Sequence, residues 1–247
     1  MPLLTLVWEG GHVDRREDAM THLRRSVLAA LTVAMCAVPV AAADGSTEHG
    51  RSAAVVPVHQ VAGTPAGEFI GANFARFYAT PVGEIPPPPC QTVGDKHQAL
   101  VMGPTGETNA CTVDRHTQLV IFGLGSACSD VEPDPFFGAD EAAQRACVVA
   151  FDHEFVTALS VTVDDDAPVD FRTGRFEVIS PQQSVQVPPD SALGLPAGPA
   201  TLVAHAWMAQ LRTLRPGQHT VSVDAVTPEF AITSTFILNV LPEGSND

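Results

Sequence analysis

Basic side chains are scarce in this 247-residue chain. Lysine and arginine together number 13 against 28 aspartates and glutamates, for a net charge of −15, and Lys96 is the only lysine. Such a surface repels phosphate backbones and anionic lipid, which excludes nucleic acid as an expected partner. Hydrophobic residues still make up 45% of the sequence, so a folded core is expected rather than disorder.

Signature motifs of common enzymes are also missing. Gly123-Leu124-Gly125-Ser126 lacks the third glycine of a dinucleotide-binding loop and the lysine of a phosphate loop. No Gly-x-Ser-x-Gly elbow occurs. We interpret these glycines as turn residues, and we expect no enzymatic activity.

Basic residues and then small apolar ones mark the N-terminal region. Arg24-Arg25 precedes an apolar segment over residues 26–40, and Ala41-Ala42-Ala43 offers a cleavage position. This order predicts a signal peptide over 20–43, cut near Ala43, with residues 1–19 as an upstream extension. The apolar segment is too short for a membrane span. Once the signal peptide is removed, the mature protein is predicted to lie outside the cytoplasm and to have no membrane span.

Four cysteines follow the predicted signal peptide: Cys90, Cys111, Cys128 and Cys147. In an exported chain, four cysteines most simply form two disulfides. Three pairings are possible, and we favour Cys90–Cys111 with Cys128–Cys147, because each closes a short loop. A zinc site is the alternative, but it lacks a Cys-x-x-Cys pair.

Apolar periodicity predicts two helices and a larger number of strands. Residues 67–78 place apolar side chains at helical spacing, and residues 140–150 form an alanine-rich helix that begins near Asp140. Most of the remaining chain alternates apolar and polar residues between Pro and Gly turns. The predicted strands cover 98–102, 111–113, 118–122, 159–163, 176–178, 205–211, 219–223 and 232–240.

This pattern predicts a mainly β fold with two helices, an antiparallel β-sandwich of jelly-roll or immunoglobulin-like type held by disulfides. We expect one β-rich domain over residues 67–241. A flexible segment over 44–66 precedes it, and a tail over 242–247 follows it.

Acidic clusters are the first candidate sites. Asp130, Glu132 and Asp134 occupy alternate positions, so in an extended segment they would share one side and could act as an acid/base pair on a glycan. A solvated acidic turn is the preferred interpretation. Asp164-Asp165-Asp166 could bind calcium but lacks the glycine and distal glutamate of an EF-hand loop, so a hairpin turn is preferred and no metal or cofactor is expected.

Histidines offer a further candidate. His153, between Asp152 and Glu154, has the chemistry for proton transfer, although a histidine at a helix end is also stabilised by the helix dipole. His205 and His219 lie on predicted strands that could be neighbours, and with an aspartate they could form a metal site. Structural histidines are the preferred interpretation.

Several motifs together resemble a known group. Gly67-Glu68-Phe69, the four cysteines, Pro135-Phe136-Phe137-Gly138 and Pro216-Gly217-x-His219 recur in one order. This arrangement resembles a family of exported bacterial proteins of uncharacterised function. The resemblance implies export and a β-rich fold, and it transfers no catalytic residue. The first helix has phenylalanines where that group usually has tryptophans.

The sequence therefore predicts a secreted binding or envelope-associated module without enzymatic activity, with a glycan or a protein as ligand. The alternative is an extracellular glycan hydrolase that uses the carboxylates of residues 130–134.

Oxidation of the four cysteines can be tested directly. Thiol titration of the denatured, exported protein without reductant is expected to find no free thiol, because all four sulfurs are paired and Cys36 leaves with the signal peptide. Four reactive thiols would contradict both the disulfides and the compartment.

Overall fold

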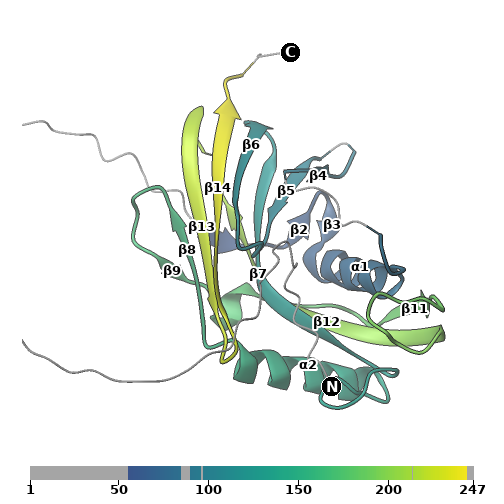
Figure 1. Ribbon diagram of the computed structural model, residues 1–247. Coiled ribbons are helices and arrows are strands. Elements are labelled where there is room, and N and C mark those ends of the chain that lie inside the picture. Colours follow the sequence, from purple (N-terminus) through teal and green to yellow (C-terminus); the bar gives the residue numbers. More distant parts are fainter. Residues whose placement is uncertain (1–54, 85–89, 96, 213, 244–247) are drawn as a thin grey trace, which may run out of the picture. The chain divides into compact units, whose positions relative to one another are not determined.

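The computed structural model describes residues 55–84, 90–95, 97–212 and 214–243 (Figure 1). The predicted upstream extension and signal peptide lie outside the described residues. So do residues 44–54 of the predicted flexible segment and residues 244–247 of the predicted tail.

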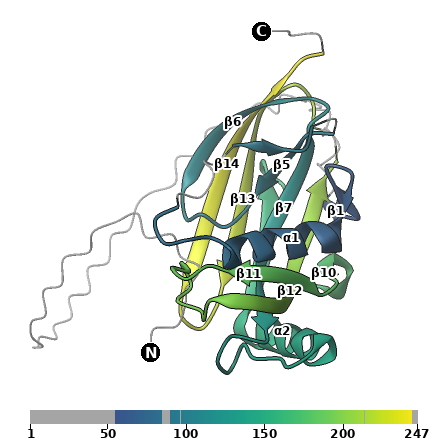
Figure 2. The same ribbon diagram turned by 90° about the vertical axis from the view of Figure 1, so that its right-hand side faces the viewer.

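In the described residues, two large β-sheets, a two-stranded sheet and two α-helices make up the fold, which confirms the mainly β class (Figures 1 and 2). The first sheet has the order β1-β12-β7-β5-β4, and β10 and β11 also pair with β12. Its strands are β1 (Val55–Pro57), β4 (Thr92–Val93), β5 (Ala99–Met102), β7 (Gln118–Ser129), β10 (Glu177–Ile179), β11 (Gln183–Val187) and β12 (Gly198–Leu211).

The second sheet has the order β6-β14-β13-β8-β9. Its strands are β6 (Thr108–Asp114), β8 (Ala158–Val163), β9 (Val169–Asp170), β13 (Gly217–Val226) and β14 (Ala231–Leu241). Most neighbours are antiparallel, as predicted, whereas β5 with β7 and β6 with β14 are parallel pairs. The sheets are therefore mixed.

The main hydrophobic core lies between the two sheets. Trp207 and Ile121 of the first sheet share one buried cluster with Phe236 and Val223 of the second. Along β14 the burial alternates, so Phe236, Leu238 and Val240 are buried while Asn239 is exposed. This alternation is the period-two pattern that predicted the strands.

Strand β12 is covered on both faces: its even-numbered residues pack on one side and its odd-numbered residues on the other. Leu202, Ala204, Ala206 and Met208 belong to the core beneath helix α1 (Ala66–Tyr78). Val203 packs with Cys128 and Val148 under helix α2 (Glu141–Phe155). Farther along that second face, Trp207, Ala209 and Leu211 enter the core between the sheets. His205 thus lies where the cover changes from α2 to the second sheet.

Helix α2 begins where predicted and ends later. The Asp140 side chain accepts a hydrogen bond from the Ala143 N–H at 2.9 Å, which caps the first turn. The helix continues to Phe155 rather than stopping at Ala150, so Asp152 and His153 belong to its last turn.

Both favoured disulfides are present. Cys90 is bonded to Cys111, and Cys128 to Cys147. The second joins β7 to α2, so it holds the helix against the first sheet.

Two sequence-based expectations are wrong in part. Gly123 and Gly125 are not turn residues but lie inside β7, where its register with β12 shifts. A Cβ at Gly123 would lie 2.5 Å from the Phe171 ring, and one at Gly125 would meet the His205 carbonyl, so close packing requires glycine here. Within the predicted flexible segment 44–66, residues 55–65 contain three short strands: β1, β2 (Gln60–Val61) and β3 (Thr64–Pro65).

Among the described residues, no helix is long and apolar enough to cross a membrane.

The buried alternation along β14 makes a matched pair of variants informative. Leu238→Ala, at a fully buried position, is expected to lower the free energy of unfolding by about 2–5 kcal/mol because it leaves a cavity between the sheets. Asn239→Ala, at the exposed neighbour, is expected to change it by no more than about 0.5 kcal/mol. Urea denaturation measures both, and equal losses would contradict the sandwich.

Candidate functional site

Two facing residues on neighbouring strands form the base of the candidate site. His205 of β12 is directly opposite Ser126 of β7 in the antiparallel register. Both contact the same carboxylate, that of Asp152 in the last turn of α2. The site therefore joins three elements that are far apart in the sequence.

Asp152 is buried, and its oxygens are saturated by donors. Oδ1 accepts a hydrogen bond from the Ser126 hydroxyl at 2.7 Å, and Oδ2 accepts one from the Ser126 N–H at 3.1 Å. Oδ2 also lies 2.7 Å from Nδ1 of His205. Because a carboxylate only accepts, this contact places the proton of the imidazole on Nδ1.

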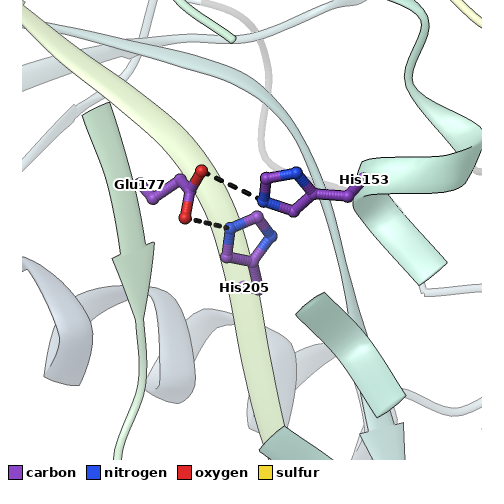
Figure 3. Close-up of side chains that lie close together, drawn as sticks. All are labelled: His153, Glu177 and His205. Atoms are coloured by element: carbon purple, nitrogen blue, oxygen red, sulfur yellow. Dashed lines mark ion pairs between the residues drawn. The ribbon is translucent and has the colours of Figure 1, made fainter. Parts of the chain in front are cut away.

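Glu177 of β10 reaches the other side of His205 (Figure 3). Its Oε2 lies 3.9 Å from Nε2 of His205, and its Oε1 lies 3.0 Å from Nε2 of His153. One nitrogen from each histidine and one carboxylate oxygen all lie within 4.8 Å of one another. Burial is graded across the cluster: the His205 side chain is 0% exposed, Glu177 21% and His153 43%.

Nε2 of His205 is buried and has no hydrogen-bond partner. With Nδ1 as the donor to Asp152, Nε2 of the neutral imidazole presents a lone pair, and the Glu177 carboxylate is a second acceptor on that side. A buried polar atom without a partner costs about 1–3 kcal/mol, and a cation between these two acceptors would satisfy both.

Aromatic and cationic groups surround the cluster. The Trp207 ring lies 4.8 Å from that of His205 and 5.4 Å from that of His153, measured between centroids. Arg172, which follows β9, donates a hydrogen bond through Nη2 to the backbone carbonyl of His153. An aromatic ring therefore lies beside the buried histidine, and a guanidinium lies at the helix end.

Two imidazoles and one carboxylate form a donor set for a divalent transition metal such as Zn²⁺. Ligand atoms around a tetrahedral ion with bonds of about 2.1 Å lie about 3.4 Å apart. The separations of 3.0 and 3.9 Å from the Glu177 oxygens to the two histidines lie on either side of that value, and all three ligand atoms lie within 4.8 Å of one another. The Asp152–His205 contact matches the usual arrangement in which a carboxylate orients a metal-binding imidazole.

The acidic segment is a turn, which is the preferred interpretation, although it is not solvated throughout. Residues 130–134 follow β7 as bends and a turn rather than as the extended segment that would place the carboxylates on one side. Asp130 accepts hydrogen bonds from the backbone N–H and the hydroxyl of Thr201. Glu132 accepts them from the hydroxyls of Tyr78 and Ser129, while Asp134 is exposed.

Burial is the largest cause of the pKa shifts in the Tyr78–Glu132 pair. It raises the pKa of the Glu132 carboxyl above the ordinary value of 4.5, although the hydrogen bonds from Tyr78 and Ser129 oppose the rise. The pKa of the Tyr78 hydroxyl is also raised, first by burial and then by the charge of Glu132. The pair ties α1 to the segment after β7.

The Asp164–Asp166 cluster lies in the turn of the β8–β9 hairpin, which is the preferred interpretation. The Asp164 carboxylate accepts a hydrogen bond from the Thr220 N–H and lies 2.8 Å from Nδ1 of His219. His219 is on β13, in the sheet that does not contain His205, so the expected neighbourhood of these two histidines is wrong.

Sequence reasoning identified His153 and His205 separately and missed that they converge. Glu177 follows a single-turn 3₁₀-helix (Gly174–Phe176), and nothing in its local sequence marks it as a partner. The adjacent Asp152-His153 pair was the available signal. This pair could be recognised as part of a site only if the helix was predicted to continue past Ala150.

Comparisons with known proteins add little. No family model matches the chain, and no curated protein matches it either. Among solved structures, a cysteine protease inhibitor from Entamoeba histolytica shows 7% identity and a TM-score of 0.22, covering 57% of this chain and 96% of its own. A similarity this low supports no inference about function.

The pH dependence of stability tests the Glu132 environment. Because the folded-state pKa is raised, the stabilising contribution of Glu132 is fully present below about pH 4.5 and is lost as the pH rises through the folded pKa. Wild type is therefore expected to lose stability relative to Glu132→Gln as the pH rises from 4 to 8, as measured by urea denaturation.

Tyr78→Phe provides the matched variant. It removes a hydrogen bond that lowers the pKa of Glu132, so the pH range of this loss is expected to move upward. A relative stability of wild type that increases with pH would contradict the assignment.

Proposed function

We propose that this protein is an exported, non-enzymatic binding module that holds one divalent transition-metal ion through His153, Glu177 and His205. The observation that carries the proposal is the buried Nε2 of His205, which faces the Glu177 carboxylate without a hydrogen-bond partner. One ligand atom from each of the three residues lies within 4.8 Å of the other two.

Export is supported by two features, and the charge of the chain favours a cation as ligand. Disulfides persist in oxidising compartments, and this chain has two. A signal peptide over 20–43 is predicted from the sequence. A net charge of −15 also attracts metal cations to the surface.

The donor types favour a transition metal over calcium. Calcium takes six to eight oxygen ligands, whereas this site offers two imidazole nitrogens and one carboxylate. Zn²⁺, Co²⁺, Ni²⁺ and Cu²⁺ all accept imidazole, and the geometry alone does not rank them. At Asp164, where calcium was the alternative, the carboxylate already accepts from Thr220 and contacts His219.

The glycan-hydrolase alternative gains no support from the geometry. Both oxygens of Asp130 accept hydrogen bonds from Thr201, and Glu132 is bound by two hydroxyls beneath α1. Such contacts position a loop, whereas an acid/base pair needs carboxyl groups that face a shared space.

Zinc titration of the chelator-treated, dialysed protein tests the proposal. Calorimetry is expected to show one Zn²⁺ bound per chain, together with a rise in melting temperature, because the ion binds the folded state. His153→Gln is expected to weaken binding by about 100-fold. Loss of a residue that only orients a ligand already costs about 10–100-fold.

His116→Gln is the matched control, since it removes an exposed histidine from the turn between β6 and β7, away from the cluster. It is expected to bind zinc as wild type does. Equal affinities of wild type and His153→Gln would reject the site, as would the absence of a saturable zinc isotherm.

A further inference from the structure

We propose that the metal ion in this site takes a small anionic oxygen ligand, a carboxylate or an inorganic oxyanion, and that the indole N–H of Trp207 and the guanidinium of Arg172 bind that ligand. This inference rests on the proposed function, because the ligand occupies a coordination position that the protein leaves open.

The first step is the count of protein ligands. His153, Glu177 and His205 supply three donor atoms, whereas zinc takes at least four ligands. Sites closed by protein alone usually have four side-chain ligands, and sites with three keep a position for water or an external ligand. Because His205 is fully buried and His153 is 43% exposed, the open position faces the His153 side.

The second step concerns polar atoms without partners. In the described part of the chain, three buried side-chain nitrogens lack a hydrogen-bond partner: Nε2 of His205, Nε1 of Trp207 and Nε of Arg172. Trp207 packs against both histidines, and Arg172 binds the carbonyl of His153. The three side chains that carry these nitrogens therefore all lie beside His153.

These three nitrogens require two kinds of partner. Nε2 of His205 presents a lone pair and accepts a metal ion. The indole and guanidinium nitrogens are donors only, so a cation cannot satisfy them. An oxygen ligand on the metal would accept hydrogen bonds from both of them. The nitrogen with a lone pair therefore suits a metal ion, and the two donors suit an anion bound to that ion.

The third step is charge. A divalent ion would offset the charges of the Asp152 and Glu177 carboxylates, and the guanidinium of Arg172 adds a positive charge beside the helix end. This positive charge favours an anionic ligand over a neutral one. Arginine also suits planar carboxylates and oxyanions, because its N–H groups form a fork.

Cobalt-substituted protein tests this inference, because the visible absorption of Co²⁺ reports its ligands. Acetate and phosphate are titrated separately into the Co²⁺-loaded full-length chain. At least one is expected to change the spectrum saturably, and the effective one identifies the ligand as a carboxylate or an inorganic oxyanion.

Two variants assign the donors. Trp207→Phe keeps a ring in the core but removes the N–H, and it is expected to weaken anion binding about tenfold while the affinity for Co²⁺ stays within about threefold. Arg172→Gln is expected to act in the same way, which keeps the test decisive if the buried Trp207 variant fails to fold.

Arg175→Gln is the matched control. It removes the same charge three residues away, from a guanidinium that lies over the Phe176 ring, and it is expected to leave anion affinity unchanged. Absence of Co²⁺ binding would reject the proposed metal site itself. Normal Co²⁺ binding with no response to either anion would overturn this inference alone, as would anion affinities unchanged in Arg172→Gln.

Discussion

The buried carboxylate of Asp152 is the constraint on which the candidate site depends. An ionised group without partners is costly in a protein interior, and here Ser126 and His205 supply three donor contacts. These contacts attach the last turn of α2 to both β7 and β12. The contact with Asp152 also places a proton on Nδ1 of His205. In the neutral imidazole, Nε2 is then left as the acceptor.

Helix α2 is held at several points along its length. The Cys128–Cys147 disulfide joins it to β7, and the Gln144 amide donates to the carbonyl and hydroxyl oxygens of Thr201. The Asp152 contacts then secure its C-terminal turn. With these attachments, His153 has a defined backbone position, and its half-exposed ring lies beside Glu177 and the His205 ring.

Local sequence signals were sufficient for much of the fold. Alternation predicted β14, aromatic spacing predicted α1, and Asp140 marked the start of α2. The Asp164–Asp166 cluster is part of a hairpin turn, as preferred from the sequence. The same signals misjudged Gly123 and Gly125, because the reason for these glycines is close contact with Phe171 and the His205 backbone from other parts of the chain.

The sequence by itself determined the class of fold, the disulfide pairing that we favoured and the acidity, because each follows from residues that act over a short stretch or through composition. Only the tertiary structure decided that His153, Glu177 and His205 share one point and that His219 belongs elsewhere. The physical reason is that this convergence depends on which strands pair with β12 and on where α2 ends. Both are settled by packing between segments that are up to about 90 residues apart in these pairings, and no local pattern encodes them.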